Sequence, residues 1–313
     1  MVSFIHLHNY SSFFCAFFTR KQRFFLNKRF FRGQILQGQR HSREKNTMQP
    51  RTSDLMIEQF GTEATEPVHA FPQKTSVRMG FSVHRASSGN TRYHTVVTGK
   101  LWQSPTEVRR RCIRLCAEIL RDYLRGAGVC RDAHILVAGI GNPNIASDAV
   151  GPKTCDRIVV TRGDSLLTGL GFPEISAVRP GVPSRTGVDT AEQIALLADH
   201  TDADLILTVD AVAARTQERL QTVLQITDAG MTPGSAMSHT SGGITRETMR
   251  RPVVSVGVPM VIRADLLNDE FSAEPMFVTR AETDIIGDCY ASVIAGAVNL
   301  ALSGNSEICP DDV

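Results

Sequence analysis

Two short, continuously apolar segments constrain the fold of this chain more than any other feature of its sequence. His134–Gly139 reads His-Ile-Leu-Val-Ala-Gly, and Leu205–Asp210 reads Leu-Ile-Leu-Thr-Val-Asp. Neither segment alternates polar with apolar residues, so we expect strands that are covered on both faces. Helical patterns separate the strands along the chain. The sequence therefore predicts an α/β fold of three layers (α/β/α), in which helices cover a mainly parallel sheet.

The remaining elements are weaker but follow the same alternation. Further strands are predicted at 76–83, 92–97, 175–179, 222–227 and 253–258, and helices at 148–160, 189–198 and 281–302. The most strongly patterned helix follows Ser104-Pro105-Thr106-Glu107, which is typical of a capping box with Pro at the first helical position. Gly126 and Gly128 are predicted to end that helix.

The first 47 residues differ in composition from the rest of the chain. They hold nine of the 15 Phe residues and nine Lys or Arg residues, against a single acid, Glu44. The basic residues follow the apolar run, whereas a signal peptide places them before it, and no uncharged stretch reaches the length of a membrane span. We interpret residues 1–47 as a non-native or disordered extension, with translation starting at Met48; a surface-lying amphipathic segment is the alternative. A single domain is expected over residues 55–313.

Charge and cysteine content narrow the partners and the compartment. The 266 residues after position 47 contain 25 basic and 31 acidic residues, so this part of the chain is mildly acidic. Such a body disfavours direct nucleic-acid binding and suits a basic partner. Seven irregularly spaced cysteines do not form a disulfide framework, which favours a reducing cytoplasm. Cys112 and Cys116 lie four apart on a helix without a further ligand nearby, so we expect core packing, no metal and no cofactor.

Two aspartates are the strongest candidates for chemistry, because ligands of open parallel sheets collect outside the carboxyl ends of the strands. Asp148 follows the glycine loop after the first apolar strand, and Asp210 ends the second. Each also has a purely structural explanation, as a charge at a helix N-terminus for Asp148 or as a turn residue for Asp210. If the two carboxyls lie close together, repulsion keeps one protonated while the other is ionised. Such a pair can activate water and protonate a leaving amine; which residue has which role stays open.

Other motifs give weaker signals. Gly139-Ile-Gly141 lacks the third glycine of a dinucleotide-binding loop, and no Gly-x-Ser-x-Gly elbow is present. Asp189-Thr190-Ala191 is better explained as a helix N-cap than as a pepsin-type motif. His239, in the Ser- and Gly-rich stretch 238–243, is expected to be a surface residue and not a base.

Several longer motifs, standing in one order, resemble the spore germination protease family. The resemblance covers residues 130–303 strongly and 48–130 loosely. The motifs are Gly139-Ile-Gly-Asn142-Pro143 with Asp148-Ala-Val-Gly151-Pro152, Val159-Val-Thr161-Arg162, Ala177-Val-Arg-Pro180-Gly181-Val182, Thr186-Gly187-Val-Asp189-Thr190, Val209-Asp210-Ala-Val-Ala-Ala-Arg215, Gln225-Ile-Thr-Asp228-Ala-Gly230-Met-Thr-Pro233-Gly234-Ser235, Gly257-Val-Pro259 and Phe277-Val-Thr279.

The resemblance implies an endopeptidase of an atypical aspartic type, without a catalytic metal, that initiates degradation of small acid-soluble spore proteins during germination. These substrates coat DNA in the dormant spore. The implied catalytic residues are Asp148 and Asp210, and the residues expected to line the cleft are Gly141, Asn142, Asp228 and Ser235. The resemblance also implies a homotetramer in the spore core, no membrane, no direct contact with nucleic acid, and a fold shared with hydrogenase-maturation proteases.

The resemblance further implies a zymogen that removes its own N-terminal propeptide. The family's Arg-Thr-Asp-Leu processing region corresponds to Arg51-Thr52-Ser53-Asp54-Leu55, with Ser53 inserted. We expect the cut between Asp54 and Leu55, which makes residues 48–54 the propeptide, shorter than is expected for the family. The stretch 238–243 also departs from the family, because it lacks the usual basic residues, which leaves open a different substrate preference.

Three other functions compete with this interpretation. A hydrogenase-maturation endopeptidase shares the opening glycine motif but uses nickel on its substrate and is about half as long, and the motifs at 228–235 and 257–259 favour the germination protease. A non-catalytic regulator that binds a spore protein would have no need of both Asp148 and Asp210. A nucleoside phosphorylase rests on fold analogy alone and has no phosphate-binding signature.

Overall fold

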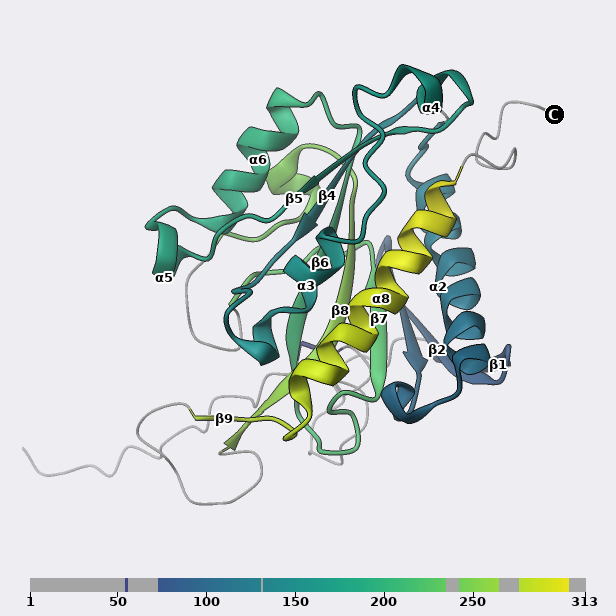
Figure 1. Ribbon diagram of the computed structural model, residues 1–313, viewed down its shortest axis with the longest axis vertical. Helices are drawn as coiled ribbons and strands as arrows, with labels where there is room; N and C mark the ends of the chain where they lie inside the picture. Colours follow the sequence, from purple (N-terminus) through teal and green to yellow (C-terminus); the bar gives the residue numbers. More distant parts are fainter. Residues whose placement is uncertain (1–53, 56–72, 131, 235–241, 265–275, 304–313) are drawn as a thin grey trace, which may run out of the picture. The chain divides into compact units, whose positions relative to one another are not determined.

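The computed structural model describes residues 54–55, 73–130, 132–234, 242–264 and 276–303, which all belong to one compact unit, Gln49–Val313 (Figure 1). Our interpretations of residues 1–47 and of the propeptide before Asp54 lie outside the described residues. So do Ser235 and His239.

One mixed sheet forms the centre of the fold. Its strands are β1 (Gln73–Arg78), β2 (Phe81–Ser88), β3 (Thr91–Val97), β4 (His134–Gly139), β5 (Glu174–Val178), β6 (Leu205–Ala214), β7 (Val223–Thr227), β8 (Val253–Arg263) and β9 (Phe277–Val278). The strand order is β1-β2-β3-β7-β8-β6-β4-β5, and β9 pairs with the end of β8.

The α/β class is confirmed, but the expectation of a mainly parallel sheet is wrong. The pairs β5–β4, β4–β6 and β6–β8 are parallel. The pairs β1–β2, β2–β3, β3–β7, β7–β8 and β8–β9 are antiparallel. Parallel neighbours need a long crossover, usually a helix, and the segments that join β1, β2 and β3 are two-residue turns. The parallel expectation therefore holds only for the half of the sheet built from β5, β4, β6 and β8.

The single strand predicted at 76–83 is in fact the turn of the first hairpin and the strand residues on either side of it. The chain turns at Met79-Gly80, where φ is 50° and 87°. Two successive residues with positive φ form the tight turn that suits the twist of a hairpin. The sequence signal was hidden because Met, unlike Asn or Asp, is an unusual first residue for such a turn.

Helices cover both faces of the sheet (Figure 1). They are α2 (Thr106–Gly126), α3 (Val150–Cys155), α4 (Ser165–Gly169), α5 (Pro183–Thr186), α6 (Thr190–His200), α7 (Arg246–Met249) and α8 (Thr283–Leu302), with 3-10 turns η1 (Leu101–Gln103) and η2 (Ala146–Asp148). In β4, Ile135 and Val137 join the core with α2, α3 and α8, whereas Leu136 and Ala138 join the core with α6. This two-sided burial is why the strand is apolar throughout.

Helix boundaries follow the capping chemistry only in part. Asp189 caps α6 as expected, since its Oδ1 accepts the N–H groups of Ala191 and Glu192. The capping box predicted for α2 does not form. Pro105 is the N-cap, and the Ser104 hydroxyl donates instead to the carbonyl of Lys100. The helix predicted at 148–160 is shortened to η2 and the six residues of α3.

The closing helix α8 is long and apolar enough to cross a membrane by length and composition alone. In this fold 61% of its apolar window is buried. It packs against α2 and α3, and the hydroxyl of its buried Tyr290 donates to the carbonyl of Gln221. Cys112 and Cys116 of α2 are buried in the same core.

Candidate active site

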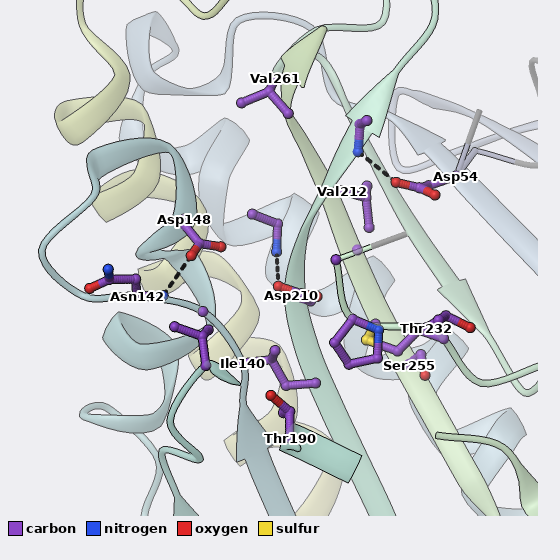
Figure 2. Close-up of a pocket in the computed structure, with 18 of the residues that line it drawn as sticks. Asp54, Ile140, Asn142, Asp148, Thr190, Asp210, Val212, Thr232, Ser255 and Val261 are labelled. Atoms are coloured by element: carbon purple, nitrogen blue, oxygen red, sulfur yellow. Dashed lines mark hydrogen bonds between the residues drawn. The ribbon is translucent and has the colours of Figure 1, made fainter. Parts of the chain in front are cut away.

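A cavity of about 620 Å³ opens where β4 and β6 carry the chain toward their carboxyl ends (Figure 2). Its walls come from four parts of the fold. They are the loop after β4, the second half of β6, the facing residues of β7 and β8, and the segments around residues 182–190 and 229–234. This is the position that open parallel sheets offer to ligands.

The glycine loop after β4 is folded tightly enough to require two of its glycines. Gly141 has φ of +125°, and a Cβ there would lie 2.0 Å from the carbonyl oxygen of Asp148. A Cβ at Gly151 would lie 2.2 Å from the carbonyl oxygen of Ile140 and 2.4 Å from that of Val209. The spacing of the glycine motif therefore lets η2 and α3 fold back onto the ends of β4 and β6.

Asp148 ends η2 and faces the cavity. Its Oδ2 accepts the main-chain N–H of Asn142 at 2.7 Å (Figure 2). Burial raises the pKa of this carboxyl to about 6, and the hydrogen bond from Asn142 limits the rise.

Asp210 lies within β6 and is 7% exposed. Its Oδ1 accepts the main-chain N–H of Ala211 at 2.7 Å. Burial raises the pKa of Asp210 well above its ordinary value, and the negative charge of Asp148 raises it further. The hydrogen bond from Ala211 acts in the opposite direction, and the charge of Asp54 adds a smaller increase.

The two aspartates thus line one cavity with unequal proton affinities. Above pH 6 the carboxyl of Asp148 is mostly ionised, and its negative charge together with burial favours the protonated form of Asp210. One ionised and one protonated carboxyl in a shared cavity is the condition for general base and general acid to act together.

Asp54 and Leu55 enter the same region from the N-terminal part of the chain. The Oδ2 of Asp54 accepts the N–H of Ala213 at 2.9 Å, and its carbonyl oxygen accepts a hydrogen bond from Nε2 of Gln225 at 3.2 Å. Asp54 lines the cavity, and Leu55 is fully buried.

The other expected cleft residues divide into three groups. Gly141 and Asn142 line the cavity. Asp228 is not among its lining residues; the Asp228 carboxylate accepts both the main-chain N–H and the Nε–H of Arg92, at 2.6 Å and 2.9 Å. Ser235 lies outside the described residues.

Polar residues of β7 and β8 were missed as cavity residues. Gln225, Thr227 and Ser255 line the cavity although they stand in strongly apolar strands. Gln225 and Thr227 alternate with Leu224 and Ile226, so the polar residues share one face of β7. That alternation was the available signal, since a polar face on a buried strand needs a partner or a cavity.

A cavity with a pair of unequal carboxyls defines a candidate hydrolytic site of the acid–base class. Comparison with known proteins assigns the chain more narrowly. A family model described as "Germination protease" matches residues 44–272. The chain belongs to the germination protease family.

Individual relatives agree with this assignment. A germination protease of Halalkalibacterium halodurans is 31% identical over 228 residues, which is 67% of this chain and 61% of that protein. Germination proteases of Bacillus cereus (strain G9842) and Bacillus mycoides (strain KBAB4) are 35% identical over 176 residues, which is 55% of this chain and 48% of each relative. The matched region therefore spans about half to three-fifths of the length of these relatives.

Proposed function

We propose that this protein is an endopeptidase that initiates the degradation of small acid-soluble spore proteins during germination. The single observation that carries the proposal is the pair Asp148 and Asp210, two carboxyls with raised and unequal pKa values in one cavity. Membership of the germination protease family supports the same activity.

The unequal pKa values suggest how the roles divide. Asp148, ionised above pH 6, takes a proton from a water molecule whose oxygen attacks the carbonyl carbon of the scissile peptide bond. Asp210, still protonated, donates a hydrogen bond to the carbonyl oxygen as negative charge develops there. When the C–N bond breaks, Asp210 gives its proton to the leaving nitrogen, while Asp148 holds the proton taken from water. The products are a free carboxyl group and a free amine, and loss of the proton from Asp148 with reprotonation of Asp210 restores the starting state.

The proposal includes several features that the resemblance implies. The chain is made as a zymogen that is cut between Asp54 and Leu55, and the presence of Asp54 in the cavity lining is consistent with processing by the same site. The active protein is a homotetramer in the spore core, with a fold akin to that of hydrogenase-maturation proteases. It acts on a basic, DNA-binding substrate, contacts neither nucleic acid nor membrane itself, and uses no metal.

A cleavage assay tests the proposal. The full chain is incubated with a small acid-soluble spore protein, with and without EDTA, and the products are resolved on a gel. Asp148→Asn and Asp210→Asn are measured in parallel. Asp228→Asn is the matched control, because that carboxylate lies outside the cavity lining and pairs with Arg92.

We expect cleavage that survives EDTA, persists in Asp228→Asn and is lost in both cavity variants. Loss of cleavage in EDTA would replace the two-carboxyl mechanism by a metal-dependent one. Absence of cleavage by folded, wild-type protein would instead favour a role in binding the spore protein.

A further inference from the structure

The segment Asp54–Leu55 is held by the rest of the domain in the way that a bound peptide is held. Two hydrogen bonds reach it from separate strands, one from the main chain of Ala213 in β6 and one from the side chain of Gln225 in β7. Leu55 completes an apolar cluster with Ala214, Leu220, Val223 and Ile262. The domain thus binds three groups within two consecutive residues: the carboxylate and the carbonyl group of Asp54 and the side chain of Leu55.

The main-chain donor of this arrangement is a strand group that the sheet leaves available. β4 pairs with β6 only as far as Gly139 opposite Val209, whereas β8 continues beside β6 to Ala214. Within the described residues, the last five residues of β6 therefore have a strand on one side only. The N–H of Ala213 donates to the side-chain Oδ2 of Asp54 and not to a neighbouring strand. A main-chain donor on the open side of a strand can in this way bind an acceptor from another segment of chain.

Gln225 stands in register with the catalytic candidate across the sheet. Asp210 pairs with Gly257, and Gly257 pairs with Gln225. Two strand spacings, or roughly 10 Å, therefore separate the backbones of Asp210 and Gln225. All three residues line the cavity, and glycine in the middle contributes no side chain to the space between the other two.

Gln225 is a buried residue, with 7% of its surface exposed, so its hydrogen bonds are made away from bulk water. Loss of a hydrogen bond by a buried amide raises the free energy of the folded protein, because water does not replace the lost bond. Gln225 therefore favours a bound carbonyl group over an empty site, whether that carbonyl belongs to Asp54 or to another chain.

We propose that Gln225 and the main-chain N–H of Ala213 form a subsite for the polypeptide substrate, and that Asp54–Leu55 occupies this subsite in the structure. The amide of Gln225 binds a backbone carbonyl group, and the N–H of Ala213 binds an acidic side chain. The occupant is a peptide in extended conformation, with a carbonyl group on the amide of Gln225 and a side chain in the Leu55 cluster. Gln225 is a positioning residue for the proposed peptidase reaction, on which this inference rests. The chain's own segment must leave before a substrate enters.

A binding experiment on the full chain tests the subsite without any cleavage. All proteins carry Asp210→Asn to prevent turnover. The probe is a fluorescein-labelled peptide that copies residues 50–58, and binding is followed by fluorescence anisotropy. Leu55→Ser weakens the chain's own hold on the subsite, so we expect this protein to bind the probe at least about tenfold more tightly than the protein with Leu55 intact.

The role of Gln225 is then isolated on the Leu55→Ser background. Gln225→Met keeps the volume of the side chain but removes the amide, and we expect a loss of affinity of about three- to tenfold. Gln103→Met is the matched control, because Gln103 is exposed and lies outside the cavity lining; its affinity should be unchanged.

A second peptide separates direct contact from a structural effect. In this peptide the amide between the positions of Asp54 and Leu55 is reduced to CH₂–NH, which removes the carbonyl that Gln225 binds. When Gln225 is present, we expect the reduced peptide to bind more weakly than the unmodified peptide. With Gln225→Met, the two peptides should bind with nearly the same affinity. This difference between the two proteins is the coupling energy of a double-mutant cycle. Additive losses, or no binding of the first peptide to the Leu55→Ser protein, would overturn the inference.

Failure of the inference and failure of the proposed function give different results. Coupling between Gln225 and the peptide carbonyl, without cleavage of spore protein by the wild-type chain, would retain the subsite and reject the peptidase. Cleavage by the wild type without such coupling would retain the peptidase and reject the subsite. Where both hold, Gln225→Met in the active chain should raise KM and leave kcat nearly unchanged, since a backbone contact far from the reacting atoms binds substrate and transition state alike.

Discussion

The two halves of the sheet differ in what their sequence is used for. The parallel half (β5, β4, β6 and β8) is the part of the fold where the two candidate aspartates lie, together with a loop in which Gly141 has no room for a side chain. In the antiparallel half (β1, β2, β3 and β7), Arg92 and Asp228 form a partly exposed ion pair, and the β2–β3 turn leaves open space around Gly89. Raised carboxyl pKa values and a tightly packed glycine loop therefore coincide where the proposed chemistry occurs, as is common for active sites.

The largest expected effect is the loss of cleavage when Asp210, in the parallel half of the sheet, is replaced. Asp210→Asn should reduce kcat/KM for spore-protein cleavage by at least about 10³-fold, because the amide cannot supply the proton that the leaving nitrogen needs. The rate is measured by quantifying intact substrate over time. Retention of most activity in a folded Asp210→Asn protein would remove the basis for placing function in the parallel half.

The glycine loops allow a comparison by stability. Gly141→Ala should lower the free energy of unfolding by about 2–4 kcal/mol, because φ of +125° and a carbonyl oxygen 2.0 Å from the new Cβ both oppose it. Gly89→Ala, at the β2–β3 turn, has positive φ but nothing within 4 Å, and should cost only about 1 kcal/mol. Urea unfolding measures both, and equal costs would contradict the tight folding of the loop after β4.

Removing the charge of Asp148 should favour the folded protein more at high pH than at low pH. The folded protein binds a proton at Asp148 more tightly than the unfolded chain, so stability falls as pH rises from about 4 to about 6 and then levels off. The change in the free energy of unfolding caused by Asp148→Asn should therefore be more favourable at pH 8 than at pH 4, by roughly 1–3 kcal/mol. Thermal unfolding at the two pH values checks this. An effect of Asp148→Asn that is the same at the two pH values would contradict the raised pKa of Asp148.

The pH dependence of the rate tests the same carboxyl in the working protein. If Asp148 is the base, kcat/KM should fall about tenfold for each pH unit below about 6 and should level off above about pH 7, where Asp148 is ionised. Initial rates from pH 4.5 to 8 give the profile. A rate that increases toward low pH would require the opposite assignment of base and acid.

The smallest effect is expected in the antiparallel half. Asp228→Asn removes the ion pair with Arg92, in which both side chains are partly exposed, and should cost about 1 kcal/mol or less. Cleavage should be nearly unchanged, because Asp228 does not line the cavity. A loss of activity comparable to that of Asp210→Asn would show that the two halves are not functionally distinct.

Prediction from sequence succeeded best where a local pattern determined the outcome. The strand His134–Gly139 was predicted with its observed bounds, and Asp189 was identified as the cap of α6. It failed where two local options had similar energies, as at Ser104, whose hydroxyl bonds to Lys100 instead of capping α2. The strands β6 and β8 continue several residues beyond their predicted ends, because their pairing with each other outlasts the apolar pattern.

The candidate site shows the same division. Asp148 and Asp210 were selected from their positions after apolar strands, and those positions depend only on the local sequence and on the geometry of parallel sheets. Gln225 and Asp54 could not be selected in this way. Gln225 reaches the cavity because β7 joins β8 in antiparallel register, and Asp54 because Leu55 is buried among residues 159 to 207 positions further along the chain.

The sequence by itself determined the parallel βα units, the glycine loop and the two acids, because strand length, helix caps and turn residues act over a few neighbouring positions. Only the tertiary structure decided that an antiparallel half completes the sheet, that Gln225 faces Asp210 across Gly257, and that burial separates the pKa values of Asp148 and Asp210. Burial and strand register are properties of segments distant in sequence, and no local pattern contains them.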